Sequence, residues 1–151
     1  MKIEDAIQTT FQNERFKAMI NIKYTANWMN TLQNRSLEKY GLTIPQYNIL
    51  RILRGAKGSP LSVTSIRERM VEKSPNTTRL MDKLIDKQFI ERVRCDKDRR
   101  VVYVMITQKG MDLLLELDDA LANSGDFMNQ LTEQEAKVVN ELLDKIREGK
   151  L

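Results

Sequence analysis

The segment Ser74–Gln88 constrains the fold of this chain more than any other stretch. Ser74 is a residue type that caps helix N-termini, and Pro75 suits the first position of a helix. Apolar residues then recur at helical spacing and predict one buried stripe, made of Leu80, Met81, Leu84 and Ile85. The segment is therefore predicted to form a short amphipathic helix that packs on the rest of the chain.

The other side of this predicted helix is polar and basic. Asn76, Arg79 and Lys83 stand at positions i, i+3 and i+7, so they share a face. Amide and guanidinium groups on a helix are the groups that read base edges in a DNA major groove. The alternative is an ordinary solvated face, and only the neighbouring segments distinguish the two interpretations.

A helix and a tight turn are predicted immediately before this segment. We expect Ser62 to cap that helix, Ile66 and Met70 to point inward, and residues 71–73 to form the turn. Two short helices joined in this way are typical of a helix-turn-helix. A capping box with proline in its first turn, Thr43–Gln46, opens another helix upstream.

The spacing of the apolar residues changes after Gln88. Residues 89–95 and 101–106 are predicted to be two strands, and the charged residues 96–100 form the tip between them. A hairpin directly after a helix-turn-helix indicates a winged helix-turn-helix. Its basic tip suits phosphates or a narrow minor groove, which attracts arginine; the alternative is a merely solvated turn.

Further helices are predicted on both sides of this core. Residues 3–40 contain neither Gly nor Pro and indicate either one long helix or a short helix followed by a long one, with Gly41 as the stop. A helix from Thr107 to about residue 123 and a last helix from the capping box Thr132–Glu135 follow the hairpin. The N-terminal helix carries excess apolar surface. A partner chain is the preferred explanation for this surface and this chain's own C-terminal helices are the alternative cover, and we expect both to contribute.

The fold class predicted from these elements is mainly α, with a small β component (α+β). It is a winged helix-turn-helix whose N- and C-terminal helices form a dimerisation region. Composition argues against an enzyme, a metal site or a cofactor, because the 151 residues include no histidine and one cysteine. No nucleotide-binding loop or nucleophile elbow occurs either.

The expected location is the cytoplasm. No apolar run approaches the roughly 20 residues of a membrane span, and the first residues, MKIEDAIQTT, do not form a secretory signal. A single cysteine suits a reducing compartment. We therefore expect no membrane association.

Charge is distributed unevenly along the chain. Residues 1–61 carry 9 Lys/Arg against 4 Asp/Glu, and residues 62–106 carry 11 against 7. Residues 107–151 reverse the balance, with 5 against 10. The basic body favours a polyanionic partner, although moderately basic proteins without such a partner are common.

Short motifs follow one another in a fixed order: Leu42-Thr43-x-x-Gln46-Tyr47-x-x-Leu50, Leu61-Ser62, Thr77-Thr78-Arg79-Leu80-x-Asp82-Lys83-Leu84, Phe89-Ile90-Glu91-Arg92, Asp98-Arg99-Arg100 and Ile106-Thr107-x-x-Gly110. Each motif alone is weak, but the ordered set resembles the DNA-binding domain of the MarR family (multiple antibiotic resistance regulators). The flanking helices extend this resemblance over nearly the whole chain.

The resemblance implies a single domain over residues 1–151, with a winged helix-turn-helix core at 42–110 and a helical dimerisation region at 1–41 and 111–151. It implies a homodimeric regulator, preferably a repressor, on a pseudo-palindromic operator of double-stranded DNA with half-sites on the order of 10 bp apart. The helical protein–protein adaptor that keeps a winged helix as scaffold is the alternative function.

The resemblance also implies which residues contact DNA. They are Ser74, Asn76, Thr78, Arg79, Lys83, Arg94, Lys97, Asp98, Arg99 and Arg100. Asn76 and Arg79 are expected at base edges, whereas Lys83, Arg94, Lys97 and Arg99 are expected at phosphates. Asp98 is expected to orient an arginine of the wing tip.

A small aromatic or phenolic effector is a further implication of the resemblance. Tyr24, Trp28 and Tyr47 are the candidate walls of its pocket, and ordinary core or dimer packing is the preferred interpretation of these three residues. The chain departs from the family pattern at Gln88, where glycine is usual. Its one cysteine, Cys95, lies in a predicted wing strand, and we expect it to be structural rather than a redox switch.

Overall fold

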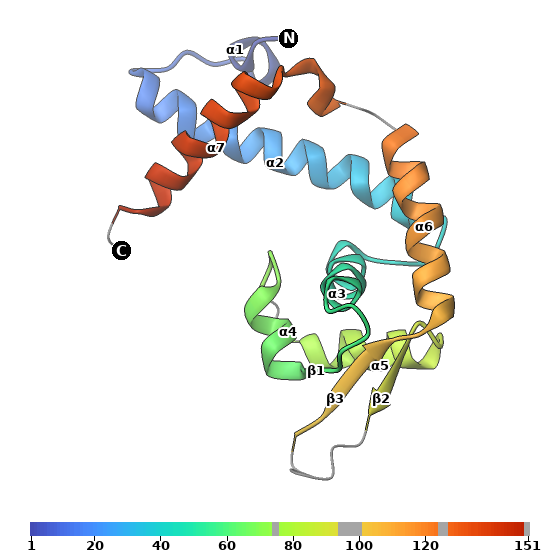
Figure 1. Cartoon of the computed structure of the whole chain (residues 1–151). Coiled ribbons are helices and arrows are strands. Elements are labelled where there is room, and N and C mark those ends of the chain that lie inside the picture. Colours follow the sequence, from blue (N-terminus) through green and yellow to red (C-terminus); the bar gives the residue numbers. More distant parts are fainter. Residues whose placement is uncertain (74–75, 94–100, 124–126, 150–151) are drawn as a thin grey trace.

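The computed structural model describes residues 1–73, 76–93, 101–123 and 127–149. Figure 1 shows two parts, which we call the head and the arm. The head comprises the described residues from Leu37 to Leu117 and contains the main buried cluster. The arm comprises α1, α2 as far as Ser36, and α7. Helices α2 and α6 run between the two parts (Figure 1).

Two helices form the N-terminal segment, α1 (Ile3–Ile7) and α2 (Glu14–Glu38). The structure thus has the second of the two arrangements that the sequence left open. Gln8, with a left-handed φ of 51°, ends α1, and Asn13 caps α2 by accepting from the Phe16 amide. Gly41 has a φ of +62° at the end of α2, so the predicted stop at this glycine is confirmed.

Three helices of the head follow: α3 (Ile44–Gly55), α4 (Val63–Arg69) and α5 (Thr77–Asp86). The Thr43–Gln46 capping box is confirmed, since each residue's side chain accepts from the other's backbone amide. Ser62 caps α4 as predicted, and its hydroxyl oxygen accepts from the Ser65 amide at 3.1 Å.

The start of α5 differs from the prediction. The helix begins at Thr77 with Asn76 at the N-cap position, so the expectation that Ser74 caps it is wrong. Ser74 and Pro75 themselves lie outside the described residues. Asn is as good a capping residue as Ser, so the helix can begin two positions later than predicted.

A three-stranded antiparallel sheet contains β1 (Leu61–Ser62), β2 (Ile90–Val93) and β3 (Tyr103–Ile106), in the order β1-β3-β2. Strands β2 and β3 are the predicted hairpin, with Ile90 opposite Ile106. Strand β1 was not predicted, and it is defined by its pairing with β3, where Leu61 lies opposite Val104.

The C-terminal part contains α6 (Gln108–Asn123), a short 3₁₀ helix (Phe127–Gln130) and α7 (Glu133–Arg147). Thr107 caps α6 as predicted, and its hydroxyl oxygen accepts from the Gly110 amide at 3.1 Å. The second predicted capping box, at the start of α7, is also confirmed. Residues 124–126, which follow α6, lie outside the described residues.

The main core lies in the head and contains side chains from helices α2 to α6 and from strands β2 and β3. Leu37 of α2, Leu50 of α3, Leu84 of α5 and Leu114 of α6 each have no exposed surface. The described part of the chain is thus mainly helical with a small sheet, as the sequence predicted. Within that part, no helix is long and apolar enough to cross a membrane.

Candidate nucleic-acid interface

Helix α5 presents two different faces. Met81 and Leu84 are buried against the head, whereas Asn76, Arg79 and Lys83 are exposed. Apolar residues at helical spacing fix which side of the helix packs inward, and the polar residues are therefore left outward. The structure brings these three predicted DNA contacts together on one exposed face, and Thr78 is also exposed.

The turn before α5 is attached to α3. The Asn48 carboxamide oxygen accepts from the Val71 amide at 3.0 Å, and Val71 lies directly after α4. At the first residue of α5, the Thr77 side chain is 2% exposed, and its hydroxyl lies 3.8 Å from the Met70 sulfur. The two helices of the helix-turn-helix are thus held together at the turn.

An ion pair joins α5 to the base of the wing. Arg92 of β2 donates from Nη2 to the Asp82 carboxylate of α5 at 2.6 Å. Both side chains line a groove of about 340 Å³ between α5 and the sheet. Because both are about half exposed, solvent screens the pair, and it contributes little to stability. Both residues are positions of the ordered motifs, but their contact was not predicted from the sequence.

Helix α5 ends in a Schellman motif. The Phe89 amide donates to the Leu84 carbonyl at 3.0 Å, and the Gln88 amide donates to the Ile85 carbonyl at 2.8 Å. Gln88 adopts a left-handed φ of 62°, the conformation that glycine usually supplies here. The departure from the family pattern therefore changes the strain at this position but keeps the geometry of the helix end.

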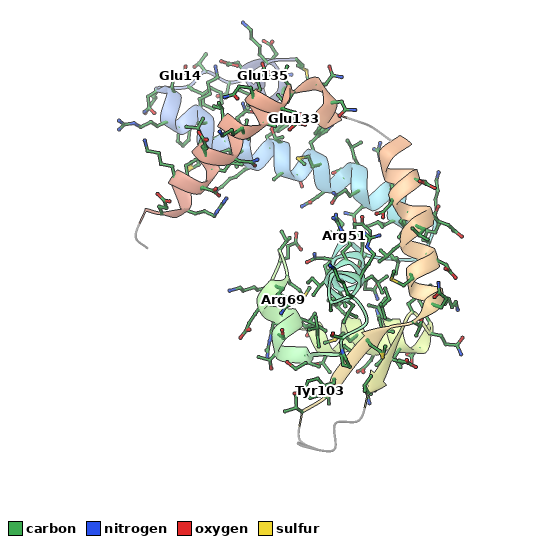
Figure 2. The ribbon with its side chains drawn as sticks, viewed as in Figure 1. Glu14, Arg51, Arg69, Tyr103, Glu133 and Glu135 are labelled. Atoms are coloured by element: carbon green, nitrogen blue, oxygen red, sulfur yellow. The ribbon has the colours of Figure 1, made fainter. Side chains whose placement is uncertain are left out.

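A groove of about 210 Å³ separates α2 from α3. Its described lining residues are Asn30, Gln33, Ile44, Pro45, Tyr47, Asn48, Arg51, Val71 and Glu72. The Arg51 guanidinium lies 5.8 Å from the centre of the Tyr47 ring, and Figure 2 shows Arg51 on the α2 side of α3. Tyr47 thus lines a groove that reaches the turn before α5.

The structure does not bring the three predicted effector-binding residues into one site. Tyr24 and Trp28 are 39% and 44% exposed on α2 and are not among the described residues of the α2–α3 groove. Helical spacing placed them on α2 but did not show which side of the helix faces α3.

The wing tip lies outside the described residues. This applies to Arg94, Lys97, Asp98, Arg99 and Arg100, and also to Cys95. The described wing extends to Val93 on one strand and begins again at Val101, and Tyr103 starts β3 opposite Val93 (Figure 2).

A helix-turn-helix with an exposed polar and basic second helix, followed directly by a β-hairpin, defines a winged helix-turn-helix DNA-binding regulator. Residues 31–117 match the family described as transcriptional regulator SarA/Rot. The chain belongs to this family of MarR-type regulators, whose members are not enzymes.

Individual relatives agree with this assignment. The chain is 29% identical to the HTH-type transcriptional regulator MhqR of Bacillus subtilis over 119 residues, which cover 78% of this chain and 81% of MhqR. A MarR-like regulator from Bacillus cereus has the same fold, with a TM-score of 0.76 at 18% identity over 89% of this chain and 96% of that one. A mutant of E. coli MarR, solved in complex with operator DNA, also has a TM-score of 0.76, at 21% identity over 91% and 99% of the two chains.

Proposed function

We propose that this chain acts in the cytoplasm as a homodimeric repressor on a pseudo-palindromic operator. The observation that carries the dimer is the arm, because none of the described residues of α7 is buried and Leu142 and Ile146 are 55% and 61% exposed. A second copy that packs on this surface would set the distance between two α5 helices. Repression needs only stable occupation of the DNA.

The proposed DNA contacts follow the exposed face of α5. Arg79 and Asn76 point away from the core and would read base edges, and Lys83 would neutralise a phosphate. For Ser74, Thr78 and the wing residues Arg94, Lys97, Asp98, Arg99 and Arg100, the proposal rests on the family resemblance. The solved complex of the E. coli MarR mutant with operator DNA supports this mode of binding.

In the proposed division of the single domain, residues 42–110 bind DNA and residues 1–41 and 111–151 dimerise. The buried cluster of the head lies mostly within residues 42–110 and supports this division at the DNA-binding end, and Leu37 of α2 and Leu114 and Leu117 of α6 extend it. The exposed apolar residues of α2 and α7 support it at the other.

A small aromatic or phenolic effector is proposed for the α2–α3 groove. A molecule there would contact α2, Tyr47 and the turn at Val71, whose amide is bound to Asn48. It would change DNA affinity only if it bound one spacing of the two heads more tightly than another. Isothermal titration of phenolic acids against Tyr47→Ala and wild-type protein tests this part, and equal affinities would contradict it.

Selection of duplex DNA from a random library, followed by mobility shifts over a salt series, tests the proposed function. Affinity should fall steeply with salt, and Lys83→Ala should reduce the slope of log K against log salt by about 1. Arg79→Ala should weaken binding about 10- to 100-fold and relax sequence preference.

Lys145→Ala is the matched control for these variants, because Lys145 is an exposed cation on α7 and is not among the proposed DNA contacts. At protein concentrations at which both proteins are dimeric, its affinity and salt slope should equal those of the wild type. Weak binding that does not depend on salt would instead favour the adaptor function.

A further inference from the structure

The C-terminal end of α5 meets the C-terminal end of α2. Lys87 follows the last residue of α5, and its ammonium group donates to the Gly41 carbonyl at 2.5 Å. Gly41 forms the turn after α2, where the Leu42 amide bonds back to the Leu37 carbonyl. A methyl group added at Gly41 would lie 3.1 Å from the Lys87 nitrogen, a tight approach that a shift of a few tenths of an ångström at the end of the lysine side chain would relieve.

The Lys87 ammonium group lies where it can stabilise the end of α2. The carbonyls at the C-terminal end of a helix carry partial negative charge, and a cation near them stabilises the helix. Lys87 is the C-cap residue of α5, and its ammonium group is bound in the turn that follows α2. Any displacement of α2 relative to α5 therefore changes its contacts.

Helix α6 binds the same end of α5. Lys109 donates from its ammonium group to the Lys87 carbonyl at 2.9 Å. The Thr107 hydroxyl lies 2.7 Å from the Gln88 carbonyl and 3.1 Å from the Phe89 carbonyl. Three consecutive carbonyls at the end of α5 are thus bound from the start of α6. Because α2 and α6 are the helices that run from the head to the arm (Figure 1), this end of α5 is attached to both connections.

The other end of α5 is held differently. Its first residue, Thr77, is 2% exposed, and the preceding turn is joined to α3 within the head. The polar face used for DNA begins at this N-terminal end. Because Asn76 and Arg79 lie farther from Lys87 along α5 than Lys83 does, a change in the angle of α5 about its C-terminal end would displace them more than Lys83.

We infer that Lys87 is a positioning residue that couples α2 to the recognition helix α5 and so sets the angle at which α5 meets DNA. It acts through the Gly41 carbonyl and not through a DNA phosphate, since its ammonium group is bound at the end of the helix opposite to Asn76. The consequence for DNA rests on the proposed function, whereas the coupling between the helices does not.

Hydrogen exchange on the full-length protein tests the coupling without DNA. Lys87→Met keeps the aliphatic part of the side chain and removes the charge. Amide exchange should accelerate at Leu42 and at Phe89 together, by about two- to fivefold, the factor expected for a cation at a helix C-terminus. Lys109→Met should accelerate exchange at Phe89 and leave Leu42 unchanged.

Lys23→Met, at an exposed position of α2, is the control and should change neither amide. If Lys87→Met leaves Leu42 unchanged, α2 and α5 are not coupled through this contact and the inference is overturned.

Operator spacing tests the consequence for DNA. The probes are the selected palindrome and the same palindrome with one extra base pair between its half-sites. Lys87→Met should reduce the wild-type preference for the selected spacing about threefold or more at an unchanged salt slope, and Lys87→Arg should restore it.

The other outcomes have distinct meanings. An equal loss of affinity on both probes would indicate a merely structural role, and a salt slope reduced by about 1 would indicate a phosphate contact; either result overturns the positioning role. Wild-type protein that selects no DNA would overturn the proposed function, and the exchange experiment would still decide the coupling.

Discussion

The head and the arm differ in what their apolar side chains contact. In the head, leucines from four helices and the strands around them have almost no exposed surface. In the arm, Phe16, Trp28 and Leu142 are 49%, 44% and 55% exposed, although they lie in helices with well-formed caps. Caps and helical spacing form a helix in either place, but only the head contains enough neighbouring chain to cover its apolar face.

This difference assigns separate tasks to the two parts. A buried core makes the head a rigid unit that can present α5 and the wing. Exposed apolar side chains cost little in a monomer but become favourable area when a second chain covers them. In the proposed dimer, the arm is the part whose burial depends on concentration, and the predictions below test this distinction.

The largest effect is expected from Leu114→Ala, since Leu114 has no exposed surface. The cavity should cost about 3 kcal/mol of the free energy of unfolding, measured by urea denaturation. Leu142→Ala makes the same chemical change on the arm and should cost less than about 0.5 kcal/mol at concentrations where the chain is monomeric. Equal losses would contradict the distinction between head and arm.

Dimerisation should respond most to a charge on the arm. Leu142→Asp would bury a carboxylate in each copy of the proposed interface and should raise the dimer dissociation constant at least about 100-fold. Sedimentation equilibrium measures this constant. Asn140→Asp adds the same charge to an exposed polar position of α7 and should leave it nearly unchanged. A wild-type protein that remains monomeric at high concentration would contradict the proposed dimer.

A smaller effect is expected within the head at the end of α5. Gln88 has a φ of 62°, a conformation that costs a residue with a side chain about 1 kcal/mol. Gln88→Gly should therefore stabilise the head by about 1 kcal/mol in denaturant titrations. Gly41→Ala, at the equivalent turn of α2, should destabilise the chain. A loss of stability in Gln88→Gly would show that the glutamine side chain contributes more than the strain costs.

The smallest effect concerns the attachment of α1 to α2 in the arm. The hydrogen bond from Lys17 is the main reason that the pKa of Glu4 is below its ordinary value. The ion pair therefore contributes stability above the pKa of Glu4 in the unfolded chain, and this contribution is lost as pH falls through the lowered pKa. Proteolysis near residues 8–13 should accelerate over that range in the wild type. The same acceleration in Glu4→Gln would contradict this explanation.

The local features of the fold were predictable from the sequence. The capping boxes at Thr43 and Thr132 depend on residues three positions apart, and both formed as predicted. The stop at Gly41 and the apolar stripe of α5 also depend on short-range rules. Within the candidate site, the exposure of Asn76, Arg79 and Lys83 followed directly from the burial of that stripe.

Features that depend on distant parts of the chain were not predictable in the same way. Two residues are too few to predict β1, and Leu61 is in a strand because Val104 lies opposite it. The contacts of Asp82 with Arg92 and of Lys87 with Gly41 join different elements. Suitable residue types for these contacts are visible in the sequence, but their distances depend on how the helices pack.

The order of the sheet has a consequence for how the chain folds during synthesis. The central strand, β3, is the last of the three to be synthesised, and β1 and β2 pair with it and not with each other. The sheet therefore cannot form until residue 106 has emerged, although α3, α4 and α5 are complete by then. Until that point, the apolar side chains that later pack against the sheet remain exposed to solvent. The nascent head should be most prone to aggregation in the interval between the completion of α5 and the emergence of β3.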